Sequence, residues 1–293
     1  QLHRRQRQMC IRDSPHFLRR LDSTLSESTH QSLPLKMSPV SFVSWMGGDR
    51  DGNPNVTSNV TAEVLLLSRW QAATLYMRDI NSLIEELSMI NSNNYVKELS
   101  NSSREPYRAV LRDVRLQLKN TIDNIENQLD GREPIYTNVI NNQKDLWDPI
   151  FACYESLQDC GMQAIADGSI IDLLRCISCF GTHLVRHDIR QHSERHSRVL
   201  EEICSHLDLG DYSNWSEDKK QKFLLEEIVG NRPLIGSDLV LTSESLEVVK
   251  TFELIAKQPQ EALGAYVISM ARRPSDILVC LLYTSPSPRD LDL

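Results

Sequence analysis

Three long segments carry apolar residues at the spacing of an α-helix, and this pattern constrains the fold more than any other feature of the sequence. The segments cover about residues 58–90, 106–129 and 142–166. Apolar side chains that recur every three to four residues form one face of a helix, and that face packs against a core. The sequence therefore predicts a mainly α protein in which residues 41–166 form mostly long helices.

Local signals mark the ends of these helices. Thr57 or Ser58 is a good N-cap for the first helix, because a side-chain hydroxyl can accept from a free backbone N–H of the first turn. Pro106 suits the first position of the second helix, and Gly131 suits its end. Between them, residues 92–104 are rich in Asn and Ser and predict a loop.

The period of the pattern changes after residue 166. Shorter helices are predicted over residues 169–179, 192–207, 216–230 and 242–257. Residues 182–190 alternate between two faces, as a strand does, and residues 264–270 form an apolar run of the length of a buried parallel strand. Strands separated by helices are typical of βα barrels, so we expect a partial βα (TIM-like) barrel over residues 167–280.

Charge and composition exclude several classes of protein. The 293 residues include 40 acidic and 32 basic side chains, for a net charge of −8, which disfavours a general nucleic-acid binder. No stretch of 18 apolar residues occurs, so we expect no transmembrane helix. The seven cysteines form no dense framework, and reduced cytosolic thiols are the better interpretation.

The turn-rich segment 41–56 contains a possible calcium loop. Asp49, Asp51 and Asn53 match its first three oxygen ligands, but the positions that require Gly and Glu hold Pro54 and Val60. A tight acidic turn before the next helix is the simpler interpretation. A third interpretation is a rigid turn in which two carboxylates hold Arg50 beside Trp45 and line a site.

Two other clusters resemble metal sites. The first consists of Cys176, Cys179, His183 and His187. Its two histidines, four apart on a strand, would lie ~13 Å apart, so they cannot share a zinc ion, and buried thiols are the alternative. The second is His192 and His196, four apart at the start of a helix, where a metal pair or two surface residues are the alternatives.

The predicted strand ends on charged residues. Asp188 and Arg190 share one face of it with Arg186, and buried charges must be paired or must face a ligand. In a βα barrel, the carboxyl ends of the strands carry the chemistry, and a guanidinium there suits a phosphate or a carboxylate. An internal ion pair is the equally weighted alternative.

Several long motifs resemble the phosphoenolpyruvate carboxylase family, in the order in which that family has them. The two most specific are SWMGGDRDGNPNVT (44–57) and LVRHDIRQHSERH (184–196). The others are LLLSRW (65–70), ELSM (86–89), EPYR (105–108), LWDPIFACYESLQDCGM (146–162), RPLI (232–235) and AYVISMARRPSDILVC (265–280). Together they place the resemblance over about residues 15–280.

This resemblance implies an α-dominated fold built around a β-barrel, in a cytosolic, allosterically regulated homotetramer that depends on Mg²⁺. The family reaction joins phosphoenolpyruvate and bicarbonate to give oxaloacetate and phosphate. Bicarbonate attacks phosphorus, which gives carboxyphosphate and an enolate held on Mg²⁺. The enolate then captures CO₂ in a pocket that excludes water. A non-enzymatic helical scaffold or binding module is the competing class.

The resemblance also implies roles for single residues. Arg190 corresponds to the arginine that clamps the substrate phosphate, and Trp45 to part of the apolar wall near the substrate methylene. Asp188, Gln191 and Arg50 are supporting residues by the same comparison.

Two positions inside the matched motifs depart from the family. His187 stands where an aliphatic residue is usual, and His192 where an acid is usual. Because His187 points away from the face of Asp188 and Arg190, the polar face of the motif is kept.

The two ends of the chain do not resemble the family. Residues 1–14 and 281–293 look like translated adapter sequence, and residues 1–14 and 283–293 are expected to be disordered. Over residues 1–40 we expect little regular structure beyond a short helix near residues 17–25. The family's catalytic His and Lys segments, its glycine-rich loop and its acidic metal ligands are absent from the sequence. The chain alone is therefore expected to be inactive, with no catalytic His or Lys and no metal ligand of its own.

Overall fold

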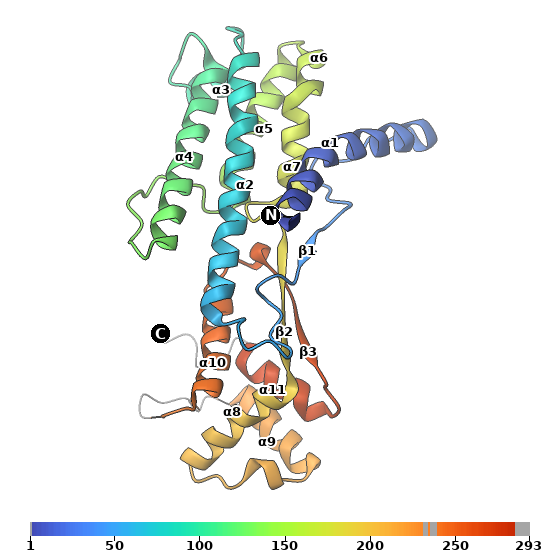
Figure 1. Cartoon of the computed structure of the whole chain (residues 1–293). Coiled ribbons are helices and arrows are strands. Elements are labelled where there is room, and N and C mark those ends of the chain that lie inside the picture. Colours follow the sequence, from blue (N-terminus) through green and yellow to red (C-terminus); the bar gives the residue numbers. More distant parts are fainter. Residues whose placement is uncertain (1, 231–233, 235–238, 285–293) are drawn as a thin grey trace. The chain divides into compact units, whose positions relative to one another are not determined.

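The computed structural model describes the backbone of residues 2–230, 234 and 239–284, and the side chains of residues 13–230, 234 and 239–282. These residues form mainly helices and one three-stranded sheet, in the order β1-β2-β3 (Figure 1). The chain divides into two compact units. The first unit is Gln1–Phe42 with Leu65–Arg186, and the second is Val43–Val64 with His187–Leu293. The prediction of a mainly α protein is confirmed.

The first unit is helical. Its elements are α1 (Leu2–Thr29), α2 (Ser58–Glu86, from Leu65 on), α3 (Asn94–Leu99), α4 (Pro106–Leu129), α5 (Gln143–Asp159), α6 (Gln163–Ile165), a π-helical turn (Ala166–Ile170) and α7 (Ile171–Phe180). In Figure 1, α2, α4, α5 and α7 run alongside one another. Their apolar faces meet in one core, as the helical periodicity predicts.

The caps explain where these helices begin. Asn142 accepts hydrogen bonds from the backbone N–H groups of Lys144 and Asp145 and forms a capping box with Asp145 at the start of α5. Pro106 opens α4, as predicted. The short helix α3 lies inside the predicted Asn/Ser-rich loop, where Asn93 caps it.

The N-terminal region contradicts the expectation of little regular structure. Helix α1 runs from Leu2 to Thr29 and passes through Pro15. It is fixed on the first unit by ion pairs with α7, since Arg19 Nε lies 2.7 Å from Asp172 and Arg175 Nη2 lies 2.5 Å from Asp22. These partners lie about 150 residues away in the sequence, so the local periodicity of residues 1–40 could not predict the ion pairs.

The second unit holds the sheet. Its elements are β1 (Val43–Ser44), the first residues of α2, β2 (Arg186–His192, from His187 on), α8 (Ser193–His206), a 3₁₀ turn (Tyr212–Asn214), α9 (Glu217–Val229), α10 (Ser243–Ala256), a 3₁₀ turn (Gln260–Ala262), β3 (Leu263–Ser269) and α11 (Pro274–Thr284). Strands β2 and β3 pair in parallel, as predicted, but no residue of β3 is fully buried, so the expectation of a buried strand is wrong. Helix α8 packs against α10 and α11, and α11 also packs against α9.

One boundary and one helix in this part differ from the predictions. Strand β2 begins at Arg186 rather than at residue 182, because Leu184 adopts a φ of 62° and a turn precedes the strand. Helix α11 was not predicted. It begins where the Glu217 carboxylate accepts from the N–H and hydroxyl of Ser275, a contact between distant segments.

The expectation of disorder at the ends has two outcomes. Residues 2–14 lie in α1 and residues 283–284 in α11, so the expectation is wrong for them. Residues 285–293 lie outside the described residues. Among the helices that the structure describes, none has the length and apolar character needed to cross a membrane.

Candidate functional site

The candidate site begins with the alternation of side chains along β2. Asp188 and Arg190 lie on its more exposed face, whereas His187, Ile189 and Gln191 are buried on the other. The predicted two-residue period is therefore confirmed, and the face with Asp188 and Arg190 is open to a neighbouring loop.

That loop is the segment 45–51, which docks on β2 through its backbone. Arg190 donates its N–H to the carbonyl of Gly48 at 2.9 Å, and Arg50 donates to the carbonyl of Arg190 at 2.9 Å. A Cβ on Gly48 would stand 2.1 Å from the carbonyl oxygen of Asp188, so no other residue fits this close approach. The glycine thus places the acidic turn directly beside Arg190.

Arg190 is held by the carboxylates of this turn. Its Nε and Nη2 donate to the two oxygens of Asp49, each at 2.8 Å, in a bidentate pair. Asp51 Oδ2 lies 3.8 Å from Nη2. The hydrogen bonds to Asp49, with the charges of Asp49 and Asp51, raise the pKa of Arg190 above its ordinary value despite the opposing effect of desolvation. The guanidinium keeps its charge and a fixed plane.

Trp45 covers the guanidinium and is itself anchored. The guanidinium carbon of Arg190 lies 5.1 Å from the centre of the Trp45 ring. The indole Nε1 donates to Asp188 Oδ2 at 2.9 Å, and Asp188 Oδ1 accepts from the N–H of Ala265 on β3 at 2.7 Å. Asp188 therefore links β3 to Trp45, and no ion pair forms between Asp188 and Arg190. The Trp45 ring is half exposed and presents an apolar surface.

The interpretation in which two carboxylates hold Arg50 is wrong. Arg50 is 3% exposed and donates to the carbonyls of Gly48 and Thr57, at 3.2 and 3.4 Å, and to the Thr61 hydroxyl at 2.5 Å. Its side chain turns inward, toward the start of α2, whereas the carboxylates before and after it in the sequence point to β2. Burial lowers the pKa of Arg50. Arg50 shapes the loop from inside and does not line the site.

Gln191 is not brought together with the other predicted residues. It is buried on the face opposite Arg190, where its Oε1 accepts from the N–H of His192 at 3.0 Å. His187 is buried on the same face, as predicted. Gln191 therefore supports the strand end rather than the exposed face.

The two histidines after β2 have different surroundings. His192 is the N-cap of α8, where its Nδ1 accepts from the N–H of Glu194 at 3.2 Å. His196 is fully buried between the rings of Phe252 and Tyr266, so the expectation of a surface residue is wrong for it. Burial lowers the pKa of His196 to about 4.

None of the three metal interpretations gains support from the geometry. Within the described parts of the chain, no three His, Cys, Asp or Glu side chains cluster in a way that could hold an ion. Both oxygens of Asp49 bind Arg190, which leaves the acidic turn without the calcium ligands that it would need. Burial raises the pKa of the Cys176 and Cys179 thiols.

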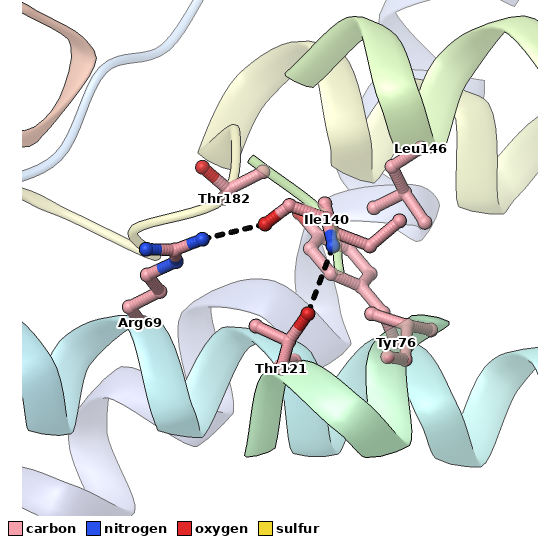
Figure 2. A pocket seen from close by; sticks show the side chains of 8 residues that line it. Arg69, Tyr76, Thr121, Ile140, Leu146 and Thr182 are labelled. Carbon is pink, nitrogen blue, oxygen red and sulfur yellow. Dashed lines mark hydrogen bonds between the residues drawn. The ribbon is translucent and has the colours of Figure 1, made fainter. Parts of the chain in front are cut away.

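The first unit contains a small cavity. It is lined by Arg69, Ala73, Tyr76, Leu118, Thr121, Ile140, Leu146 and Thr182. Figure 2 shows that the backbone of Ile140 bridges the cavity wall, since its carbonyl accepts from Arg69 Nη2 and its N–H donates to the Thr121 hydroxyl. Its lining includes the polar side chains of Arg69, Thr121 and Thr182, and the first two hold the backbone of Ile140.

Sequence reasoning missed the partner of Arg190 and the anchor of Asp188. The sequence indicates Asp49 as a calcium ligand or a partner of Arg50, and its place in an Asp-Arg-Asp turn is the signal for a partner of another arginine. The Ala265 N–H carries no sequence signal at all, because every residue except proline has that group.

Comparison with known proteins places the chain in a family. The family model described as phosphoenolpyruvate carboxylase matches residues 4–286, a range wider than residues 15–280. The phosphoenolpyruvate carboxylase of Hahella chejuensis is 50% identical over 268 residues, which are 92% of this chain and 30% of the relative. Those of Aliivibrio salmonicida and Photorhabdus laumondii are 47% and 49% identical, over 95% and 90% of this chain and 32% and 30% of each relative. The chain thus spans about a third of the length of these relatives, and it belongs to the phosphoenolpyruvate carboxylase family.

Proposed function

We propose that the full-length protein to which this chain corresponds joins phosphoenolpyruvate and bicarbonate into oxaloacetate and phosphate. Membership of the family supports this reaction. The single structural observation that carries it is the Arg190 guanidinium, fixed by Asp49 and covered by Trp45 at the carboxyl end of β2. A charged, oriented fork of N–H donors in that position fits a phosphoryl group.

Arg190 binds the phosphoryl oxygens of the substrate. As phosphorus is attacked, charge spreads over those oxygens, and a guanidinium held in place stabilises it without reorganising. Since Asp49 occupies Nε and one hydrogen of Nη2, the substrate meets Nη1 and the outer hydrogen of Nη2.

Trp45 supplies the apolar wall. Its half-exposed ring excludes water from the side on which the substrate methylene would lie, which protects a carbanion-like centre from protons. Asp188 holds the ring by its Nε1. Arg50 and Gln191 support the loop and the strand end from their buried positions.

The remaining machinery belongs to the part of the protein outside this chain. Mg²⁺, implied by the family, does not fit the described residues, because Asp49 and Asp188 are engaged in hydrogen bonds and no three His, Cys, Asp or Glu side chains cluster to hold an ion. We assign Mg²⁺, its ligands and the catalytic His and Lys to the rest of the protein. The chain alone is then inactive.

We also propose the wider setting that the family implies. The three strands form part of a βα barrel, residues 15–280 form an internal part of one catalytic domain, and the complete protein is an allosteric homotetramer in the cytoplasm. The six cysteines whose side chains are described are free thiols. The foreign origin of residues 1–14 and 281–293 stays a prediction, which the flanking genomic sequence tests.

A hybrid enzyme tests the assignment. Residues 15–280 replace the matching segment of the full-length Hahella chejuensis relative, and oxaloacetate formation is coupled to NADH oxidation. Arg190→Ala is expected to lower kcat/KM for phosphoenolpyruvate by roughly 10²-fold, and Arg190→Lys to recover only part, because an ammonium lacks the planar fork. An Arg190→Ala hybrid that melts early but turns over normally would show a purely structural arginine. A hybrid that folds and never forms oxaloacetate would favour the scaffold class.

A further inference from the structure

We propose that Asp49 is a positioning residue that decides which edge of the Arg190 guanidinium meets the substrate phosphoryl group. This inference rests on the proposed function, because it gives the phosphate clamp its orientation. It assigns a role to a carboxylate that itself stays off the substrate.

Asp49 occupies some of the hydrogen-bond donors of the Arg190 guanidinium and leaves others open. Asp49 takes Nε and Nη2 at 2.8 Å each, so one long edge of the fork is occupied. No hydrogen bond joins Nη1 to any residue that the structure describes, and the second hydrogen of Nη2 points away from Asp49. The open edge of Arg190 is therefore the terminal Nη1/Nη2 edge, which can donate two parallel hydrogen bonds to a phosphoryl group.

Asp49 is itself held in place. Its backbone forms an isolated parallel β-bridge with Arg190, and its Oδ1 also accepts from the N–H of Asp51 at 3.2 Å. The carboxylate and the guanidinium are thus attached to two paired backbone segments with a fixed register. Asp49 has few other positions available to it, so its orientation passes to the arginine.

The flat face of the Arg190 guanidinium is covered by Trp45. Trp45 lies against it, with 5.1 Å between the guanidinium carbon and the ring centre, and is locked by Asp188. Trp45 fixes the plane but permits rotation within it, whereas Asp49 removes that rotation. The Arg190 side chain is 29% exposed, so without Asp49 a long flexible side chain would sample several rotamers.

An opposite role for Asp49 is a gate that competes with the substrate for Arg190. Competition would require Asp49 and the phosphoryl group to use the same donors. In the observed pair the carboxylate is on the Nε side and the terminal edge stays open, which favours positioning.

A double-mutant cycle in the hybrid enzyme tests the inference. Asp49→Asn keeps the size of the side chain but places an NH₂ group against a cation. We expect the KM for phosphoenolpyruvate to rise about tenfold while kcat falls no more than a few-fold. In an Arg190→Ala background, the same change should have no further effect on kcat/KM, because there is nothing left to orient. Asp130→Asn, at an exposed pair with Arg132, is the matched control and should leave KM unchanged.

Each alternative has its own result. If the KM falls in Asp49→Asn, Asp49 is a gate. If the effects of Asp49→Asn and Arg190→Ala on kcat/KM multiply, Asp49 acts independently of Arg190 and its role is structural. Either result overturns the inference. If Arg190→Ala keeps normal kcat/KM, the proposed phosphate clamp fails instead, so the two failures are distinguishable. If Asp49→Asn melts too early for assay, Asp49→Glu keeps the charge but displaces the carboxylate, and a normal KM in that variant also overturns the inference.

Discussion

His196 makes the stability of the second unit depend on pH. The ring is fully buried on α8 between Phe252 of α10 and Tyr266 of β3. Its Nε2 lies 3.3 Å from the Tyr266 hydroxyl, and its Nδ1 has no hydrogen-bond partner among the described residues. Burial lowers the pKa from 6.5 to about 4, an effect that Asp276 opposes and His192 reinforces.

The direction and size of the pH effect follow from the difference in proton binding between the folded and unfolded chain. Between pH 6.5 and about 4, the unfolded chain binds a proton at residue 196 that the folded chain does not. The free energy of unfolding therefore falls as pH decreases through this window, and the contribution is fully present above pH 6.5. A difference of about 2.5 pH units corresponds to a loss of about 3 kcal/mol at pH 4 relative to pH 7.5.

Urea unfolding followed by circular dichroism measures this contribution in wild type and in His196→Gln. The variant has no titrating ring, so its free energy of unfolding should fall by about 3 kcal/mol less than that of wild type over the same pH range. His206→Gln makes the same chemical change at an exposed position of α8 and should follow wild type. Parallel pH curves for wild type and His196→Gln would refute a buried, neutral histidine.

Two further predictions concern the packing of the loop and of α1. Gly48→Ala should speed amide exchange at Arg50 and Arg190 at least ~10-fold, because the new Cβ would stand 2.1 Å from the Asp188 carbonyl oxygen; unchanged exchange at both amides would contradict this. Asp22→Asn removes the carboxylate that pairs with Arg175 and should lower the free energy of unfolding by roughly 2 kcal/mol. The loss is smaller than for a fully buried pair because Asp22 is partly exposed. An unchanged urea midpoint would contradict this prediction.

The long helices could be predicted because their signals are local. Helices α4 and α5 begin within a residue or two of their predicted starts, where Pro106 and Asn142 act on the nearest turn. Helix α11, and α1 beyond the predicted short helix near residues 17–25, could not, because the groups that fix them, Asp172 for α1 and Glu217 for α11, belong to distant segments. The parallel pairing of β2 and β3 followed from composition, but its register depends on the packed structure.

The candidate site was predicted as a face but not as a network. A two-residue period is enough to place Asp188 and Arg190 on one side of a strand, and to place His187 on the other. The partners are a different matter. Whether Arg190 pairs with Asp188 or with Asp49 depends on a backbone bridge between residues about 140 apart, which Gly48 permits through its missing side chain. The same bridge directs Arg50 inward, so that its neighbours' carboxylates serve another arginine.

The charges around Arg190 predict that the chain alone binds phosphoenolpyruvate poorly. One guanidinium faces the exposed side of the site with three carboxylates, Asp49, Asp51 and Asp188, whereas Arg50 is buried and bound to the loop. A highly charged anion that approaches Nη1 therefore meets three carboxylates beside this one guanidinium. Affinity and catalysis require cations from other parts of the protein, which act together with Arg190 as a unit. We expect no heat of binding for phosphoenolpyruvate in isothermal titration of the purified chain, and no bicarbonate-dependent oxaloacetate above a blank. Either signal, if abolished by Arg190→Ala, would show that these residues suffice without the rest of the protein.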